Sequence, residues 1–305
     1  KRRLNFLHDE ILLRFGKDAQ MALIDTQTFP MSRQRLEAAI RLLPTNSDIF
    51  SGNRMREARM EFICGSKVLP AIRGWLLATQ VAKNDGRSYL LTEFGKRIYT
   101  YDPQARKAGS WWALHLNVCF SSRCEPYRTF FAVLGDCNSW LAIDLGFAET
   151  ISPTLIKISG GSVAPISIEG NLEGVKKMFL GDSPLTDLGL IETRKEAGTR
   201  LFRLGSPEVT DQTLVYALAL ARERHFRHAP TVNFQELIGI DFHHFLGLSV
   251  NKLKRRLRDL SRQRAWEEYL KFAEGKDLES IELRDKLRPR HAVLALLQDA
   301  DDTWL

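Results

Sequence analysis

Long apolar runs are missing from this 305-residue sequence, and none approaches the ~20 residues of a bilayer-spanning helix. No secretory leader is recognisable at its start, Lys1-Arg2-Arg3. The four cysteines show no Cys-x-x-Cys spacing and match no common zinc site, which favours reduced thiols over disulfides or a bound metal. These absences predict a cytoplasmic protein with no membrane partner and no structural metal.

The remaining composition is that of a folded protein with basic character. Hydrophobic residues make up 44% and charged residues 27% of the chain, which is typical of globular domains and excludes bulk disorder. The length allows two or three small domains, each with its own core. The pI near 9.3 favours anionic partners, with nucleic acid first and acidic membrane surfaces second.

The most basic stretch is Leu248–Arg264, LSVNKLKRRLRDLSRQR. It holds seven cations against the single anion Asp259, so its local charge is +6 in a chain whose formal charge is +7. A helix would separate an apolar stripe from a cationic face, namely Val250, Leu253, Leu257 and Leu260 from Lys254, Arg255, Arg258 and Arg262.

A tight turn precedes this helix. The segment His243–Gly247 is typical of a helix ended by glycine, and Ser249 is suited to cap the next helix. A helix, a glycine turn and a basic helix form the sequence pattern of a helix-turn-helix, whose second helix can enter a DNA major groove. The alternative is a structural helix with a solvated, charged face. We predict double-stranded DNA as the partner, contacted by Lys252, Lys254, Arg255, Arg258, Arg262 and Arg264.

The same layout of helices followed by a hairpin occurs three times. It predicts a mainly α fold with small β-hairpins, of the α+β class, built from tandem winged-helix or helix-turn-helix units. Weak strands are expected at Ile156–Ile158 and Ala164–Ile168. The expected boundaries are an N-terminal helical segment at 1–47, a winged-helix unit with apolar helices at 48–137, a second such unit with a long helix at 138–229, and a basic winged unit at 230–305.

The first two units also carry cations where a winged helix contacts DNA. In the first unit they lie on the second helix and beside an Asn-Asp-Gly-Arg hairpin turn, and in the second unit on a hairpin around Ala197-Gly198. We therefore extend the predicted DNA contacts to Lys67, Arg73, Lys83, Arg87, Arg194 and Arg200.

A nuclease site is not evident from compact carboxylate or histidine motifs. The densest group of ionisable residues is Asp241-Phe242-His243-His244, immediately before the basic helix, so Asp241, His243 and His244 are the catalytic candidates. The favoured alternative is that Asp241 caps a short helix and the two histidines line a turn. The apolar run that contains Trp111, Trp112 and His115 is interpreted as core.

Several short motifs in the first half, which together cover about a third of the chain, resemble the SspB-like family. This family is a domain of unknown function in bacterial DNA-phosphorothioation and related defence gene clusters. The resemblance rests on their order and spacing: Thr28-Phe29-Pro30, Ile72-Arg73-Gly74-Trp75-Leu76, Leu91-Thr92-Glu93-Phe94-Gly95, Trp111-Trp112-Ala113-Leu114-His115 and Tyr127-Arg128-Thr129-Phe130-Phe131.

The resemblance implies a DNA-binding protein that acts with other phosphorothioation proteins and nicks one strand for sulfur modification, with a divalent metal such as Mg²⁺ if it is a nickase. Many relatives have a histidine shortly before the Thr-Phe-Pro motif, where this chain has Asp25-Thr26-Gln27. The departure leaves two alternatives open. One is a non-enzymatic DNA-recognition subunit or transcription regulator, and the other is a protein-interaction scaffold whose basic helix binds an acidic partner.

Overall fold

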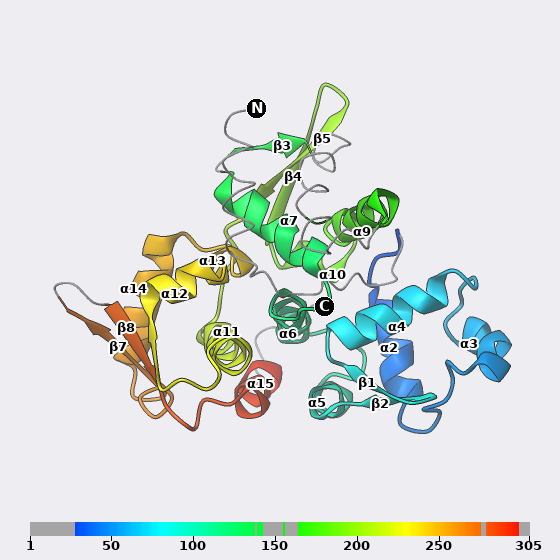
Figure 1. Cartoon of the computed structure of the whole chain (residues 1–305), viewed down its shortest axis with the longest axis horizontal. Helices are drawn as coiled ribbons and strands as arrows, with labels where there is room; N and C mark the ends of the chain where they lie inside the picture. The colour runs from blue at the N-terminus through cyan, green and yellow to red at the C-terminus, as the bar shows by residue number, and fades with distance from the viewer. Residues whose placement is uncertain (1–27, 138, 143–154, 156–163, 276–278, 299–305) are drawn as a thin grey trace.

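The computed structural model describes residues 28–137, 139–142, 155, 164–275 and 279–298 (Figure 1). Over these residues the fold is α+β, with many helices and three small antiparallel sheets. The predicted class, mainly α with small hairpins, is confirmed at this level. The expected helix in residues 1–20 and the weak strand at Ile156–Ile158 lie outside the described residues.

The first part of the chain forms one helical cluster with a two-stranded hairpin. Its elements are α2 (Arg33–Leu42), the 3-10 turn η1 (Gly52–Arg54), α3 (Met55–Glu61), α4 (Val68–Ala78), β1 (Ala82–Asp85), β2 (Ser88–Leu91) and α5 (Glu93–Tyr101). Asp85 pairs with Ser88, which leaves Gly86 and Arg87 as a two-residue turn. Gly86 has a φ of 61°, the left-handed conformation that such a hairpin turn requires.

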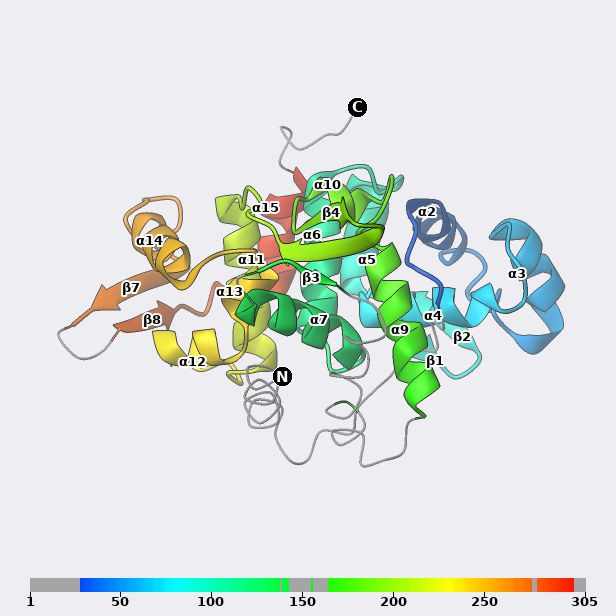
Figure 2. The same cartoon turned by 90° about the horizontal axis from the view of Figure 1, so that it is seen from above.

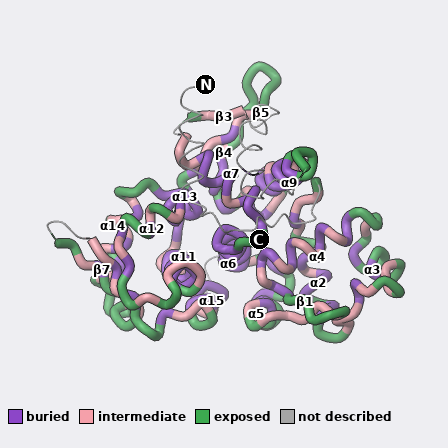
Figure 3. Tube along the Cα trace, viewed as in Figure 1, coloured by how far each residue is buried: buried purple, intermediate pink, exposed green. Residues whose placement is uncertain are grey.

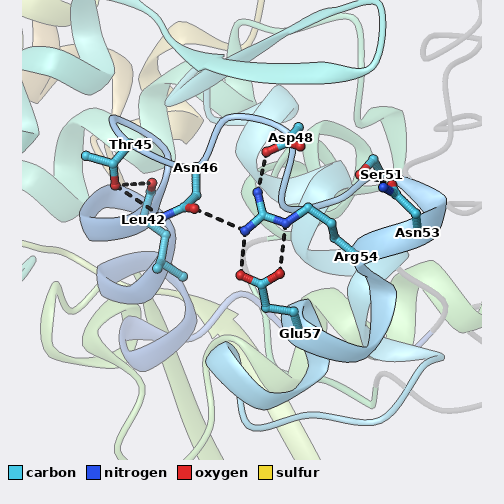
Figure 4. Close-up of polar contacts among 8 residues, drawn as sticks. All are labelled: Leu42, Thr45, Asn46, Asp48, Ser51, Asn53, Arg54 and Glu57. Carbon is cyan, nitrogen blue, oxygen red and sulfur yellow. Dashed lines mark hydrogen bonds and ion pairs between the residues drawn. The ribbon is translucent and has the colours of Figure 1, made fainter.

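One guanidinium organises the connection from α2 to α3. Arg54 donates to the amide oxygen of Asn46 at 3.1 Å and to Glu57 Oε2 at 2.8 Å, and also binds Asp48 (Figure 4). These acceptors raise the pKa of Arg54, and the Arg54 hydrogen bond lowers the pKa of Glu57. The network fixes where α3 begins.

Helix α6 (Ala108–Cys119) lies at the centre of the molecule (Figures 1 and 3). Every one of its residues is buried, because the helix is apolar on all sides. Trp111 and Trp112 belong to the core, as predicted. The ring of His115 bonds the Tyr127 hydroxyl of α7 (Glu125–Asp136) at 2.8 Å and the Phe245 carbonyl at 2.7 Å, and burial lowers its pKa to about 4. His115 is therefore a core histidine, as expected.

The second part packs a three-stranded sheet against α7. It contains β3 (Leu141–Ala142), α9 (Pro165–Lys177), α10 (Pro184–Asp187), β4 (Ile191–Glu196) and β5 (Thr199–Leu204), with strand order β3-β5-β4. The strand expected at Ala164–Ile168 is wrong, because Pro165 starts α9. Proline is well suited to the first turn of a helix, where its missing N–H is not needed.

The third part begins with the long helix α11 (Asp211–Arg224). It continues with β6 (Thr231–Asn233), α12 (Phe234–Gly239), α13 (Phe242–Phe245), α14 (Val250–Ser261), β7 (Leu270–Glu274), β8 (Glu279–Leu283) and α15 (Pro289–Gln298), with strand order β6-β8-β7. Asn233 caps α12 in a reciprocal capping box with Glu236, as its position predicts.

The three parts share one continuous core. The sheet of β6, β7 and β8 lies at one end of the long axis and α3 at the other (Figures 1 and 2). Helix α15 packs on α11, α6 and α5, so the last helix joins the third part to the first. The expected domain boundaries stay predictions. No helix within the described ranges combines the length and apolarity needed to cross a bilayer.

Candidate nucleic-acid interface

Helix α14 forms as its sequence predicts. The Ser249 hydroxyl accepts a hydrogen bond from the Lys252 amide at 3.3 Å and caps the helix. Leu253, Leu257 and Leu260 are fully buried, whereas Val250, which was predicted to belong to the same apolar stripe, is exposed at the first position of the helix. Because this stripe anchors the helix to the core, its opposite face is turned to solvent.

The hairpin β7–β8 neutralises part of this face. Arg258 donates to both carboxylate oxygens of Glu274, at 2.7 and 2.6 Å. Lys254 binds Glu279 and lies 3.5 Å from Glu274. These cations hold the pKa of Glu274 at about 2, with the Arg258 hydrogen bonds as the main cause. Lys254 and Arg258, both predicted to contact DNA, therefore have intramolecular partners.

A third cation of α14 is also engaged. Arg256 donates to the Val209 carbonyl and to Asp211, each at 2.7 Å, which ties α14 to the start of α11. With Asp211, Glu274 and Glu279 added to Asp259, the seven cations of Leu248–Arg264 meet four carboxylates, so a local charge of +6 becomes +3. The cations that form no ion pair within the described residues are Lys252, Arg255, Arg262 and Arg264.

The cations predicted in the first part lie elsewhere. Lys67 is exposed at the start of α4, but Arg73 is only half-exposed, because most of α4 is buried. Lys83 and Arg87 are exposed on the β1–β2 hairpin. These elements lie at the opposite end of the long axis from α14 (Figures 1 and 2), so the fold does not place the two predicted sets on one compact surface.

The β4–β5 hairpin carries the remaining predicted cations. Arg200 is exposed, whereas Arg194 pairs with Glu196 at 2.8 Å and lies 4.5 Å from the ring centre of Trp140. Arg203 lies 4.7 Å from the same ring centre and pairs with Glu192. Cation–π contacts therefore hold this basic hairpin against the residue before β3.

A cleft of about 550 Å³ opens beside the start of α14. The end of α7, the β4–β5 sheet and the α13–α14 turn form its walls. Its ionisable lining groups are Cys137, His243, His244, Glu192 and Arg203. The two imidazole centres are 3.8 Å apart, with the rings inclined by 40°.

His244 lies between two carboxylates. Its Nδ1 is 3.5 Å from Asp241 Oδ1, and its Nε2 is 3.9 Å from Asp136 Oδ1. Both histidine side chains and Asp241 are buried. A histidine held beside a cleft by neighbouring carboxylates is a candidate general base.

Two backbone features fix this arrangement. Gly135 packs closely against the imidazole of His244, because a Cβ at this position would lie 2.2 Å from His244 Cγ. Asp241 adopts a left-handed conformation, with a φ of 61°, and its carbonyl accepts from the His244 amide at 3.0 Å. The expected side-chain cap at Asp241 is not observed, because its carboxylate faces His244 and makes no cap hydrogen bond.

Sequence reasoning missed three members of this region, Asp136, Trp140 and Arg203. Asp136 is the last residue of the apolar helix α7 and Trp140 precedes a two-residue strand, so no periodic pattern marks either. Arg203 belongs to a basic hairpin, but only the fold shows that it lines the histidine cleft.

The described residues around this cleft do not form a metal-binding site. Among the described residues, no group of three or more histidine, cysteine, aspartate or glutamate side chains is arranged to hold a metal ion. Magnesium is commonly held by one or two carboxylates together with water and substrate phosphates. Here Asp241 and Asp136 lie beside different nitrogens of His244, so the two carboxylates do not converge on one position. The described donor set therefore does not fit a resident Mg²⁺.

Comparison with known proteins gives one family and one fold. A model of the family described as a protein of unknown function, DUF4007, matches residues 25–297. A crystal structure of magnesium ion-bound SspB superimposes with a TM-score of 0.73 at 17% identity, covering 92% of this chain and 88% of that chain. A second SspB crystal structure gives 0.72 at 16% identity, covering 95% and 91%. No curated protein matches the sequence. At these identities the likeness is one of fold.

Proposed function

Because the chain belongs to the DUF4007 family of proteins of unknown function and shares the fold of SspB, we propose that it is a double-stranded DNA-binding protein that nicks one strand. The assignment to a DNA-phosphorothioation system, with its other proteins as partners, follows from the sequence resemblance to the SspB-like family. The observation that carries the proposal is a capped basic helix, α14, whose first turn borders a cleft with a carboxylate-flanked histidine.

The topology of the third part supports a winged-helix unit. Helix α11 is followed by β6, α12, the short helix α13, α14 and the hairpin β7–β8, and β8 lies between β6 and β7. The described elements of the second part follow a similar order, α7, β3, α9, α10 and the hairpin β4–β5, with β5 between β3 and β4. In such a unit α14 occupies the position of the helix that enters the major groove.

Binding would combine two kinds of contact. Lys252, Arg255 and Arg262 on α14 supply phosphate or base contacts, and Arg264 extends them past the end of the helix. Arg200, exposed on the β4–β5 hairpin, lies on the part of the fold that also walls the cleft. A duplex along α14 would thus carry a phosphodiester toward the cleft.

His244 is the residue proposed to move the proton. One imidazole nitrogen accepts a proton from water while the water oxygen bonds to phosphorus and the bond from phosphorus to one sugar oxygen breaks; the departing sugar oxygen takes up a proton from solvent and leaves as a hydroxyl. The carboxylates of Asp241 and Asp136 stabilise the imidazolium. Arg203, in the same cleft, is positioned to neutralise charge on the phosphate. No step is assigned to Mg²⁺, because the described residues do not fit it.

Supercoiled plasmid tests the proposal. The full chain should convert it to the open-circle form, and His244→Ala should slow this by at least about 10²-fold while leaving duplex affinity unchanged. His228→Asn is the matched control, since His228 is exposed and does not line the cleft. Reactions with Mg²⁺, Mn²⁺ or EDTA measure any metal requirement. Lack of open-circle product under all of them would rule out nicking.

The second candidate function is DNA recognition without catalysis, as a recognition subunit or transcription regulator. It is favoured by the spacing around His244, since 3.5 and 3.9 Å exceed normal hydrogen-bond lengths, and by the lack of a metal cluster among the described residues. Specific duplex binding with no plasmid nicking would support this candidate.

A further inference from the structure

A second cleft, of about 520 Å³, lies between the first and third parts of the molecule. Residues of α5, α6, α11 and α15 line it. We propose that this cleft binds a phosphate-bearing molecule of nucleotide size, a role that goes beyond the proposed DNA nicking and does not depend on it.

The first argument is the environment of Arg224. Its guanidinium donates to the Asn117 carbonyl at 3.0 Å, to the Asn117 side-chain oxygen at 2.7 Å and to the Gln80 side-chain oxygen at 2.6 Å. All three acceptors are neutral, and Arg224 forms no ion pair within the described part of the chain. Burial lowers the pKa of Arg224, and the negative charge of Glu223 opposes this shift without a direct ion pair. A largely buried cation held by neutral groups favours an anion beside it.

The second argument is the charge of the cleft walls. Arg97 and Arg290 line the same cleft, and neither forms an ion pair with a described residue. Two carboxylates also line it, of which Glu93 is bound by Lys96 at 2.8 Å and Glu223 is exposed to solvent, as Arg290 is, so the three arginines exceed the carboxylates by one charge. Three guanidiniums from α5, α11 and α15 therefore converge on one space, which is the donor pattern that recognises phosphate groups.

The third argument concerns size and apolar surface. A volume of about 520 Å³ is far more than one phosphate needs and falls within the range of small-molecule sites. Phe94, Leu220 and Val293 add apolar surface to the lining. A molecule with a phosphate end and a flat or apolar end, such as a nucleotide, matches both features.

Titration of the full chain with ATP, pyrophosphate and adenosine tests the site by calorimetry and thermal shift. ATP and pyrophosphate should bind and adenosine should not. Arg97→Ala with Arg290→Ala should weaken ATP binding at least about tenfold, because two charge-assisted contacts are lost. Neither residue takes part in the hydrogen bonds of Arg224 with Asn117 and Gln80, so the variant keeps this network. Arg106→Ala with Arg123→Ala is the matched control, since both arginines are exposed and line neither cleft.

The outcomes separate the two sources of phosphate. Displacement of ATP by a short duplex would identify the bound group as backbone phosphate, and simultaneous binding would identify it as a free nucleotide. Either result supports the phosphate site, including in a protein that proves unable to nick plasmid. Adenosine binding as tightly as ATP, no binding of any phosphate compound, or full ATP affinity in the Arg97/Arg290 variant would overturn it.

Discussion

The ion pairs between α14 and its hairpin should limit how strongly the basic helix binds DNA. Lys254 and Arg258 are bound by Glu279 and Glu274, so a phosphate must compete with a carboxylate for each of them. Replacing both glutamates with glutamine removes the competitors and keeps the side-chain shape. We therefore expect Glu274→Gln with Glu279→Gln to raise duplex affinity.

The size of the effect follows from counterion release. Each phosphate neutralised by a cation contributes about 0.9 to the slope of log affinity against log salt. Two released cations should steepen the slope by about 1.8. Conversely, Arg255→Ala with Arg262→Ala removes two cations that are unpaired within the described structure and should flatten the slope by about 1.8.

Fluorescence anisotropy with a labelled duplex, between about 50 and 200 mM salt, measures both slopes. Glu169→Gln with Asp182→Asn is the matched control, because it changes the net charge equally, while both side chains are exposed, form no ion pair with a described residue and line neither cleft. An unchanged slope in the Glu274/Glu279 variant would refute the competition. Equal steepening in the control would show that overall charge, and not the ion pairs, sets the effect.

Three further predictions concern stability and the cleft. Burial depresses the pKa of His115 to about 4 from an unfolded value of 6.5, so the protein takes up a proton when it unfolds between pH 4 and 6.5. The free energy of unfolding, measured in urea, should therefore fall by about 3 kcal/mol as the pH drops from 6.5 to 4. A free energy that stays constant over this range would contradict the prediction. Gly135→Ala should lower the free energy of unfolding by about 1–3 kcal/mol and slow nicking, because the added methyl group displaces His244. Gly52→Ala is the control: no atom lies near its Cβ, so the melting temperature and the nicking rate should stay unchanged. Ile63 is exposed with a φ of 46°, so Ile63→Asn should raise stability by about 1 kcal/mol in thermal unfolding; a loss of stability would show that the isoleucine is not strained.

Local patterns were sufficient to predict several elements of the fold. The Asn-Asp-Gly-Arg segment gave the correct hairpin, and Ser249 was correctly predicted as a helix cap. Such signals succeed because turn and cap chemistry act within four residues of the chain. The strand expected at Ala164–Ile168 failed, since a short apolar run does not separate strand from helix and Pro165 started a helix there.

The candidate site was only partly predictable. Asp241, His243 and His244 are neighbours in the sequence, and the structure brings His243 and His244 into one cleft, with the Asp241 carboxylate turned toward His244. Asp136 comes from a helix more than a hundred residues earlier, and Arg203 from a hairpin that sequence analysis treated only as a basic wing. No pattern in the sequence between them predicts that Asp136 and Arg203 lie near the two histidines.

The sequence by itself determined the amphipathic basic helix, its cap and the turn before it, because these depend on periodicity and short-range hydrogen bonds. The tertiary structure decided which of its cations have intramolecular ion-pair partners and which are left for the proposed contacts to DNA. Glu274, Glu279 and Asp211 are distant in the chain from the residues they bind, and they reduce a local charge of +6 to +3. The local charge around a helix depends on every charged group near it in space. These carboxylates lie near α14 only because the β7–β8 hairpin and α11 pack against it.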